Sequence, residues 1–247
     1  MEKQEYVKHY ELEQDYWWFA GRREIILGVL RSLRYQPGKA LLLDAGCGTG
    51  LNLQAVQPFG YAVGLDHEPD ALRFCRRRGL KNVLRADIRN FPFSEGTFDV
   101  VLLLDVLSHR SIVSDVDVLG DVRRILKKGG FLLLTDSAFP FLWSRHDRAF
   151  HVRERYTRRS LGLRTARAGL AVRRMSYFQF FFFLPLVILR LWERIRKSEE
   201  DIPVSNLKKL NRLTNGLMLR VFRLESSLLK HVRLPFGSSL LLLAQKR

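Results

Sequence analysis

The fold is decided by the stretch Leu41-Leu-Leu-Asp44-Ala-Gly46-Cys47-Gly48-Thr49-Gly50. In this stretch an apolar run ends in an acidic residue, a loop with three glycines follows, and a helix-like segment begins at Leu51. Buried parallel strands read as continuous apolar runs, and glycines permit a tight turn that a ligand can approach closely. The stretch therefore predicts a strand, a ligand-binding turn and a helix at one edge of a parallel sheet.

Similar units recur on both sides of this stretch. Apolar runs predict strands at residues 40–44, 61–66, 82–87, 98–106, 130–136, 171–179 and 238–244, the last before a short basic tail. Helices are expected at 51–58, 70–78, 114–128 and from Thr157 towards Gly169, with Ser114 or Asp115 as the cap of the third and Gly129-Gly130 as its end. Strands alternating with helices predict a doubly wound α/β fold with a mostly parallel, seven-stranded, Rossmann-like sheet.

The chain divides into three expected regions. Residues 1–37 form an N-terminal helical cap, residues 38–179 and 236–247 form the core, and residues 180–235 form a helical insertion between strands six and seven. Two segments of the insertion, 186–196 and 207–230, are predicted to be amphipathic, with apolar residues at helical spacing among Lys and Arg. The apolar stretch 178–189 is shorter than the about 20 residues that a bilayer-spanning helix needs.

Charge is distributed unevenly along the 247 residues. Residues 1–140 carry 19 Lys and Arg against 18 Asp and Glu, whereas residues 141–247 carry 23 against seven. A nearly neutral first part suits a domain that binds a small cofactor, and a basic second part attracts anionic lipid, phosphate-bearing substrate or nucleic acid, or is only a solvated face. Two cysteines and an N-terminus charged from its second residue predict a reducing cytosol, without disulfides or a secretory signal.

The glycine-loop stretch and three later segments resemble the class I S-adenosylmethionine-dependent methyltransferases. Ala86-Asp87-Ile88 matches the position that faces the adenine, residues 98–109 match strand four and its loop, and residues 125–130 match the turn before strand five. The third glycine comes one position earlier than in the dinucleotide fingerprint GxGxxG, which disfavours NAD. The resemblance implies S-adenosylmethionine as the cofactor, held by Asp44, Gly46, Cys47, Gly48, Thr49, Gly50, Asp66, His67, Asp87, Ile88, Asp105 and Arg22.

The resemblance implies particular roles for some of these residues. Asp66, which ends the second strand, would accept hydrogen bonds from the ribose hydroxyls. Asp87 would face the adenine amino group, or serve only as a turn residue. Cys47 is expected in a small buried site and not as a nucleophile. The segment Tyr16-Trp-Trp-Phe-Ala-Gly-Arg-Arg23 resembles a branch associated with cell-surface saccharide and lipid assembly. Its aromatic residues either close over the cofactor or dock the helix on the sheet, and Arg22 or Arg23, with Arg22 preferred, would pair with the methionine carboxylate.

Methyl transfer requires alignment of the acceptor and, for a hydroxyl acceptor, a base. His109, after strand four, is one candidate catalytic residue. His146 and His151 are two more, in residues 144–156, a segment similar to one in the same branch; the alternative is a well-bonded loop over the cofactor. No metal site is expected, because His146 and His151 are five residues apart and no third ligand is evident.

The acceptor is inferred from the insertion. Residues 104–107, Leu-Asp-Val-Leu, differ from the Asn/Asp-Pro-Pro-aromatic motif of enzymes that methylate base amino groups, and no RNA-binding module is recognisable. An apolar and basic insertion favours O-methylation of a small-molecule, lipid or lipid-linked saccharide acceptor by a cytoplasmic protein, peripheral on an anionic membrane surface. The alternatives are a homodimer interface at 178–191, an RNA methyltransferase, and a non-catalytic scaffold or sensor that binds S-adenosylmethionine.

Overall fold

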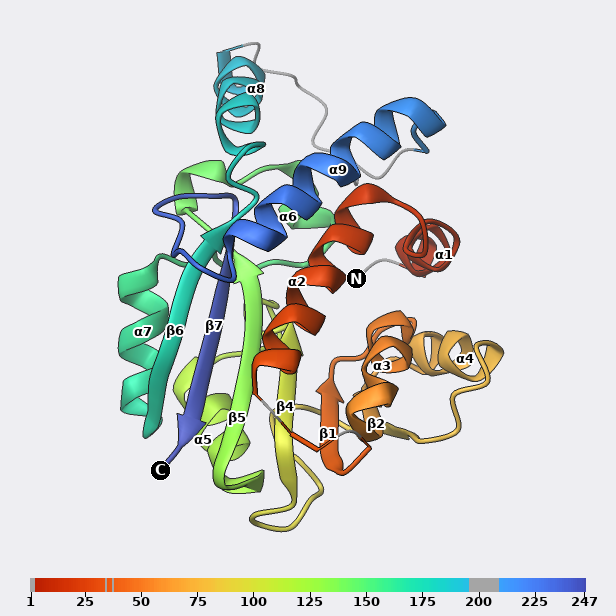
Figure 1. The fold of residues 1–247 in the computed structure, drawn as a ribbon, viewed down its shortest axis with the longest axis vertical. Helices are drawn as coiled ribbons and strands as arrows, with labels where there is room; N and C mark the ends of the chain where they lie inside the picture. The colour runs from red at the N-terminus through yellow and green to blue at the C-terminus, as the bar shows by residue number, and fades with distance from the viewer. Residues whose placement is uncertain (1–2, 34, 37, 196–208) are drawn as a thin grey trace.

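A seven-stranded sheet with the order β3-β2-β1-β4-β5-β7-β6 forms the centre of the computed structural model, which describes residues 3–33, 35–36, 38–195 and 209–247 (Figure 1). The sheet is parallel except that β7 runs antiparallel to both of its neighbours. The strands are β1 (Ala40–Ala45), β2 (Gly60–Asp66), β3 (Val83–Arg85), β4 (Phe98–Leu104), β5 (Leu126–Ser137), β6 (Leu170–Phe178) and β7 (Ser239–Lys246). The predicted α/β fold and its mostly parallel sheet are confirmed.

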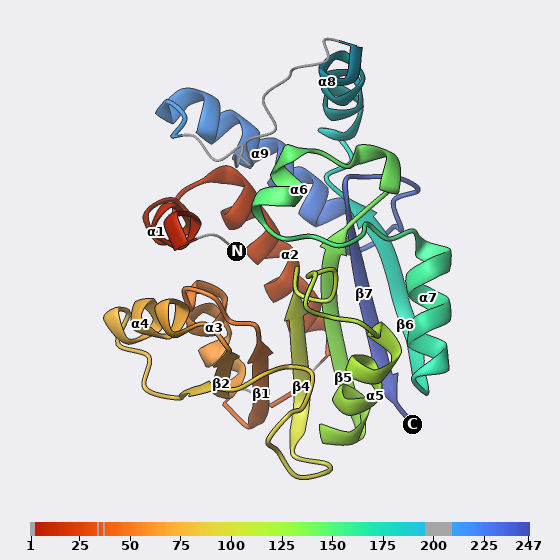
Figure 2. The same cartoon turned by 180° about the vertical axis from the view of Figure 1, so that it is seen from behind.

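Helices cover both faces of the sheet. They are α1 (Lys3–Leu12), α2 (Trp17–Ser32), α3 (Leu51–Val56), α4 (Pro69–Arg77), α5 (Asp115–Ile125), α6 (Arg145–Ala149), α7 (Arg158–Arg167), α8 (Phe183–Ile195) and α9 (Arg212–Leu228), with short 3-10 helices at Gln57–Phe59 and Pro140–Leu142. One apolar core joins the sheet to α2, α3, α4 and α9, and a second joins it to α5 and α7 (Figures 1 and 2). The carboxyl ends of the parallel strands meet at one edge, beside α1 and α6 (Figure 1).

Two predicted boundaries are wrong. The helix expected over 114–128 ends at Ile125, because Leu126 is fully buried and pairs with Phe98 of β4, so β5 begins there. The expected basic tail after residue 244 belongs to β7, where Lys246 is buried and donates to the Leu126 carbonyl at 2.8 Å. Both errors arise where lysines lie at the end of a strand: Lys127 and Lys128 are exposed in β5, and Lys246 is buried in β7.

The insertion between β6 and β7 is packed against the N-terminal cap. Gly21 of α2 faces Phe222 of α9 so closely that a Cβ at Gly21 would lie 1.6 Å from the ring. The Asn215 side chain accepts from the Trp17 amide at 2.9 Å and donates to the Asp15 carbonyl at 2.8 Å. The N-terminal cap and the insertion, which are far apart in the sequence, therefore pack together in one helical layer. The ends of the two amphipathic segments at residues 196 and 207–208 lie outside the described residues.

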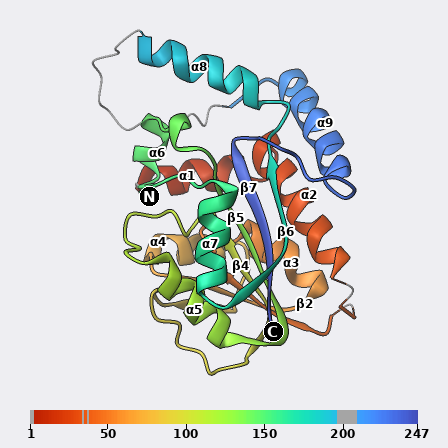
Figure 3. The same ribbon diagram turned by 90° about the vertical axis from the view of Figure 1, so that its left-hand side faces the viewer.

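Helix α8 extends away from the sheet and lies across the top of the molecule in Figure 3. Its exposed apolar side chains are Leu184, Ile188, Leu189, Leu191 and Trp192. Helix α9 exposes Leu213, Leu217 and Leu224. Among the described residues, no helix is both long enough and apolar enough to cross a bilayer.

Candidate active site

The glycine loop joins β1 to α3 and requires left-handed backbone at Gly46, Gly48 and Gly50, where φ is +81°, +55° and +87°. A Cβ at Gly46 would lie 2.5 Å from Val106, and one at Gly50 would lie 2.6 Å from Leu80. At Gly48 a Cβ would meet no atom of the described residues within 4 Å. Gly46 and Gly50 thus pack against protein, whereas Gly48 presents bare backbone to open space, where a ligand can approach.

Asp66 ends β2 beside this loop. Its two carboxylate oxygens accept the amides of Gly48 at 2.9 Å and Glu68 at 3.0 Å, and burial raises its pKa. Each oxygen keeps a further lone pair for a donor such as a hydroxyl. Asp66, the residue predicted to bind the ribose hydroxyls, is therefore held against the glycine loop with its carboxylate oxygens already in place to accept hydrogen bonds.

Asp44 and Arg22 bring two buried, opposite charges to the same end of the sheet. Asp44 is 1% exposed, and neither of its oxygens has a hydrogen-bond partner among the described residues. Burial raises its pKa to about 7, against the opposing effect of Arg22. Arg22 is 7% exposed, its Nε also lacks a partner within the described part of the chain, and burial lowers its pKa to about 10. Buried polar atoms without hydrogen-bond partners are costly, so the Asp44 carboxylate and the Arg22 Nε are sites that a ligand with a cationic group and a carboxylate could satisfy.

The other end of the Arg22 guanidinium forms an ion pair with Asp105, in the loop after β4. Trp18 stacks on the same guanidinium, with the Arg22 Cζ 4.5 Å from the ring centroid. Asp105 has a positive φ of 61° and accepts the Thr135 hydroxyl at 3.2 Å. Arg22 therefore links the N-terminal cap to the β4 loop. Trp17 and Phe19 instead pack into the core. This agrees with the alternative prediction, that the aromatic residues dock the helix on the sheet.

Glu13, directly after α1, is a site residue that sequence reasoning missed. It accepts a hydrogen bond from the Thr49 hydroxyl of the glycine loop and forms an ion pair with Arg78 at 2.6 Å. Arg78 also donates to the Thr49 carbonyl at 3.0 Å. Glu13 lies 36 residues before its loop partner, so no local pattern could have identified it.

Cys47 and Cys75 lie side by side beneath the glycine loop, with their sulfurs 3.9 Å apart and both residues buried. The Cys75 thiol also contacts the Gly48 carbonyl at 3.2 Å. The hydrogen bond with Cys75 and burial raise the pKa of Cys47 well above its usual value, so its thiol stays protonated. This agrees with a packing residue and not with a nucleophile.

The remaining predicted cofactor residues lie at the ends of β2 and β3. His67 is exposed and pairs with Glu68 at 3.0 Å. Asp87 is held by Arg89 at 2.6 Å, a contact that lowers its pKa, and its neighbour Ile88 packs on the core. Asp87 also accepts the Arg89 amide, as a turn residue does, so its contact with adenine stays a prediction.

The structure brings two of the three proposed catalytic histidines together. The rings of His109 and His151 are 5.7 Å apart, and an isolated bridge pairs His109 with Val152. The His67 ring lies 6.4 Å from the His109 ring. His146 instead packs on Phe150, with ring centroids 4.5 Å apart, and burial lowers its pKa to about 4.

The hydrogen bonds of His109 define its tautomer. Its Nδ1 lies 3.2 Å from the Ser111 amide and 2.8 Å from the Ser111 hydroxyl, and the amide, which can only donate, favours the neutral ring with its proton on Nε2. Burial lowers the pKa of His109 to about 4, which keeps the ring neutral near pH 7. His109 is thus arranged to donate a hydrogen bond through Nε2, whereas a base must offer a lone pair.

The segment 144–156 is a tightly bonded loop. Asp147, 1% exposed, accepts the Ser144 amide at 2.8 Å and forms an ion pair with Arg155 at 2.9 Å. Arg155 also donates to the Ala138 carbonyl at 3.0 Å. Asp147 therefore serves the structure of this loop, which carries His151 towards His109.

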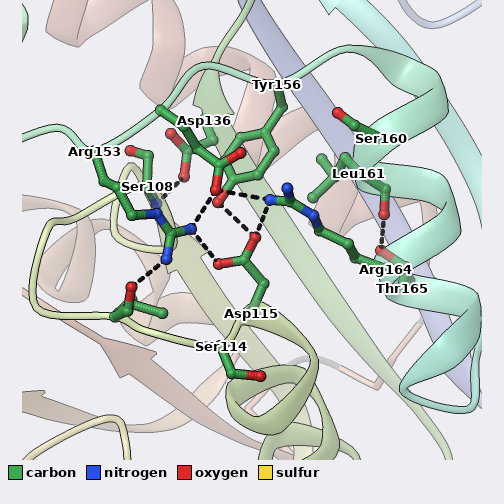
Figure 4. Close-up of polar contacts among 12 residues, drawn as sticks. Ser108, Ser114, Asp115, Asp136, Arg153, Tyr156, Ser160, Leu161, Arg164 and Thr165 are labelled. Carbon is green, nitrogen blue, oxygen red and sulfur yellow. Dashed lines mark hydrogen bonds and ion pairs between the residues drawn. The ribbon is translucent and has the colours of Figure 1, made fainter.

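A buried polar network holds this loop against the β4 loop (Figure 4). Asp115 accepts the Tyr156 hydroxyl at 3.0 Å and forms ion pairs with Arg153 at 2.6 Å and with Arg164. The Arg153 amide donates to the Ser108 carbonyl, whose own amide donates to Asp136 at 3.0 Å. The side chains at the mouth of the site are consequently positioned by α5, α7 and β5 together.

Part of the chain matches a known family of proteins. Residues 43–134 match the family described as "Methyltransferase domain". The chain is 33% identical over 100 residues to the tRNA (carboxymethyluridine(34)-5-O)-methyltransferase of Arabidopsis thaliana, covering 40% of this chain and 24% of that protein. It is 38% identical over 104 residues to the fatty-acid O-methyltransferase of Mycolicibacterium smegmatis, covering 39% of this chain and 36% of that protein. The matched region is thus a minor part of each relative.

The fold has similar solved structures. Phosphoethanolamine N-methyltransferase 2 of Haemonchus contortus, solved with S-adenosyl-L-methionine, gives a TM-score of 0.57 at 18% identity, covering 89% of this chain and 51% of that one. Residues 43–134 therefore match a methyltransferase domain, and the sheet order and the glycine loop are those of the class I S-adenosylmethionine-dependent methyltransferase fold.

The described residues fit the cofactor of this family, S-adenosylmethionine. The unpartnered carboxylate of Asp44 suits a cationic group, the unpartnered Nε of Arg22 suits a carboxylate, and Asp66 suits hydroxyls. In the described part of the chain, no cluster of three His, Cys, Asp or Glu side chains could hold a metal ion.

Proposed function

We propose that the protein transfers a methyl group from S-adenosylmethionine to an acceptor presented at a membrane surface, either a lipid or a saccharide carried on a lipid. Bound S-adenosylmethionine supplies an electrophilic methyl group with a good leaving group. Asp44, Arg22, Asp66 and the glycine loop would hold it. The observation that carries the cofactor part is the pair of buried, unpartnered polar groups on Asp44 and Arg22.

His151 is the base that we propose for a hydroxyl acceptor. His109 beside it presents Nε2–H and so would orient the acceptor oxygen by donating to it. Their closeness at the β4 loop supports this division of roles, because an acceptor must lie within about 3–3.5 Å of the transferred methyl group. His146, packed on Phe150, would act by positioning the loop.

The insertion supports a lipid-bound acceptor. Helix α9 exposes Leu213 and Leu217 near the exposed Arg212 and Arg220, and α8 adds further exposed apolar side chains. Apolar and basic side chains together suit the headgroup plane of anionic membranes. Both helices are at the carboxyl edge of the sheet, where open α/β folds bind their ligands (Figure 1). The similarity to a fatty-acid O-methyltransferase agrees with this acceptor class.

RNA is the second candidate acceptor, favoured by the similarity to a tRNA methyltransferase and by the basic second half of the chain. One experiment separates the two. Purified protein receives methyl-labelled S-adenosylmethionine with fractionated lipid, saccharide and RNA extracts, and the labelled product is identified by mass.

We expect label in the lipid fraction. Asp44→Asn should abolish both cofactor binding and labelling, whereas the matched change Asp117→Asn, at an exposed site on α5, should alter neither. Label confined to RNA would contradict the lipid acceptor, and intact cofactor binding without label in any fraction would indicate a scaffold or sensor.

A further inference from the structure

An arginine-lined groove lies at the outer edge of the sheet, away from the glycine loop. It has a volume of about 470 Å³ and is lined by Arg158, Arg159, Gly162, Val172, Arg173, Arg174, Met175 and Arg233. Ligand pockets typically measure about 300–1,000 Å³. The lining therefore combines five guanidinium groups with enough space for a ligand, and no residue of the described chain that lines it is acidic.

The five arginines come from three segments that fold together. Two are in the first turn of α7, two are on the edge strand β6, and Arg233 follows α9. The amide of Arg158 donates to the Tyr177 hydroxyl at 3.1 Å, which ties the start of α7 to β6. The positive end of the α7 dipole adds to the positive charge of this groove.

The hydrogen bonds of these arginines leave their charge largely uncompensated. Arg173 donates to the Gln245 amide oxygen at 2.8 Å and Arg174 to the Val232 carbonyl at 3.5 Å, and both acceptors are neutral. The pKa of Arg174 is lowered by burial and by the charge of Arg233. Like charges held this closely repel one another unless an anion lies between them.

We propose that this groove is a binding site for a phosphate group, supplied by the headgroup of an anionic lipid. Guanidinium groups match phosphate through paired hydrogen bonds. RNA is disfavoured because none of the lining residues in the described chain is aromatic, and single-stranded RNA is commonly bound by stacking its bases on rings.

The position of the groove supports the lipid source. Strand β6 runs from the groove directly into α8, and Arg233 ends the same insertion. Figure 3 shows α7 and β6 side by side beneath α8, so the groove and the exposed apolar helix lie on one side of the molecule. The phosphate chemistry is independent of the proposed methyl transfer, and only the choice of a lipid as its source rests on that proposal.

The test is co-sedimentation with phosphatidylcholine vesicles that contain or lack phosphatidic acid, in parallel with titrations of inorganic phosphate and of a single-stranded RNA. The variant combines Arg158→Gln, Arg159→Gln and Arg233→Gln. The control combines Arg31→Gln, Arg76→Gln and Arg77→Gln, which removes the same charge from exposed positions on α2 and α4. Melting curves of both variants establish that they fold.

We expect the wild-type protein and the control to bind phosphatidic acid vesicles. The groove variant should bind about 100-fold more weakly, from roughly a factor of five for each arginine. Equal losses in the two variants would overturn the site. Groove-dependent binding of free phosphate but not of vesicles, or of RNA in preference to vesicles, would overturn the lipid source. The measurement needs neither acceptor nor cofactor, so its failure is distinguishable from a failure of methyl transfer.

Discussion

Asp115 in the first turn of α5 accepts the hydroxyl of Tyr156 at 3.0 Å, across 41 residues of sequence. The carboxylate is almost fully buried and also neutralises two arginines. Asp115→Asn should lower the free energy of unfolding by about 1.5–3 kcal/mol, because it removes the charge of a buried hydrogen-bond acceptor while both arginines keep Glu154 as a partner. Urea denaturation measures the change. Asp117→Asn, exposed in the same turn, should cost less than about 1 kcal/mol, and equal effects would contradict the role of the network.

Two glycines of α2 provide an internally controlled test of the contact with α9. Gly21→Ala places a Cβ 1.6 Å from Phe222 and should destabilise the protein, since overpacking costs about 1–3 kcal/mol. Gly28→Ala, in the same helix with no described atom within 4 Å of the new Cβ, should stabilise the protein by about 1 kcal/mol. Thermal denaturation of both variants measures the difference. A Gly21→Ala variant as stable as wild type would refute the packing.

Glu225 holds the start of the insertion. This buried carboxylate accepts the amides of Gln179, Phe180 and Phe181, and burial raises its pKa. Glu225→Ala should cost on the order of 3 kcal/mol, because it leaves buried amides without an acceptor. Hydrogen exchange at residues 179–181 should accelerate as well. Glu24→Ala breaks an exposed ion pair with Arg223 and serves as the control, at about 1 kcal/mol or less.

Asp44 makes the stability of the ligand-free protein dependent on pH. Its pKa is about 7 in the folded state and about 3.9 when unfolded, so the folded state holds the proton more tightly. Stability should therefore fall as pH rises between about 4 and 7, by at most about 4 kcal/mol from this group. Asp44→Asn removes that loss, so the variant should exceed wild type in stability at pH 8 and match it near pH 4. A difference that does not vary with pH would show that Asp44 is not buried as an unpartnered acid.

The proposed base predicts a separation of turnover from cofactor binding. His151→Asn should lower kcat by about 10²–10⁴-fold without changing the calorimetric affinity for S-adenosylmethionine, because general base catalysis contributes about that factor. His231→Asn, at an exposed position after α9, is the control. An unchanged kcat in the His151 variant would mean that a group other than His151 takes the proton from the hydroxyl that receives the methyl group.

Local patterns predicted the sheet, since each buried strand is a continuous apolar run and the glycine loop marks the ligand edge. They also placed Asp44 and Asp66 on adjacent strand ends. The contacts that complete the site join distant segments: Glu13 with Thr49, Arg22 with Asp105, and Asp115 with Tyr156. One sequence shows that these residues are polar but not which of them meet. Leu126 was assigned to a helix because the two lysines after it obscure a buried strand start.

The close fit of Gly21 against Phe222 has a consequence for exchanging acceptor specificity between relatives. Helix α2 and the insertion form a single packed unit although about 150 residues of chain separate Ser32, the end of α2, from Phe183, the start of α8. A chimaera that receives a foreign insertion alone would set a new surface against an old α2, with a clash or a void at this glycine. Transplanting specificity onto this scaffold therefore requires both segments to be moved together, as if they were one domain.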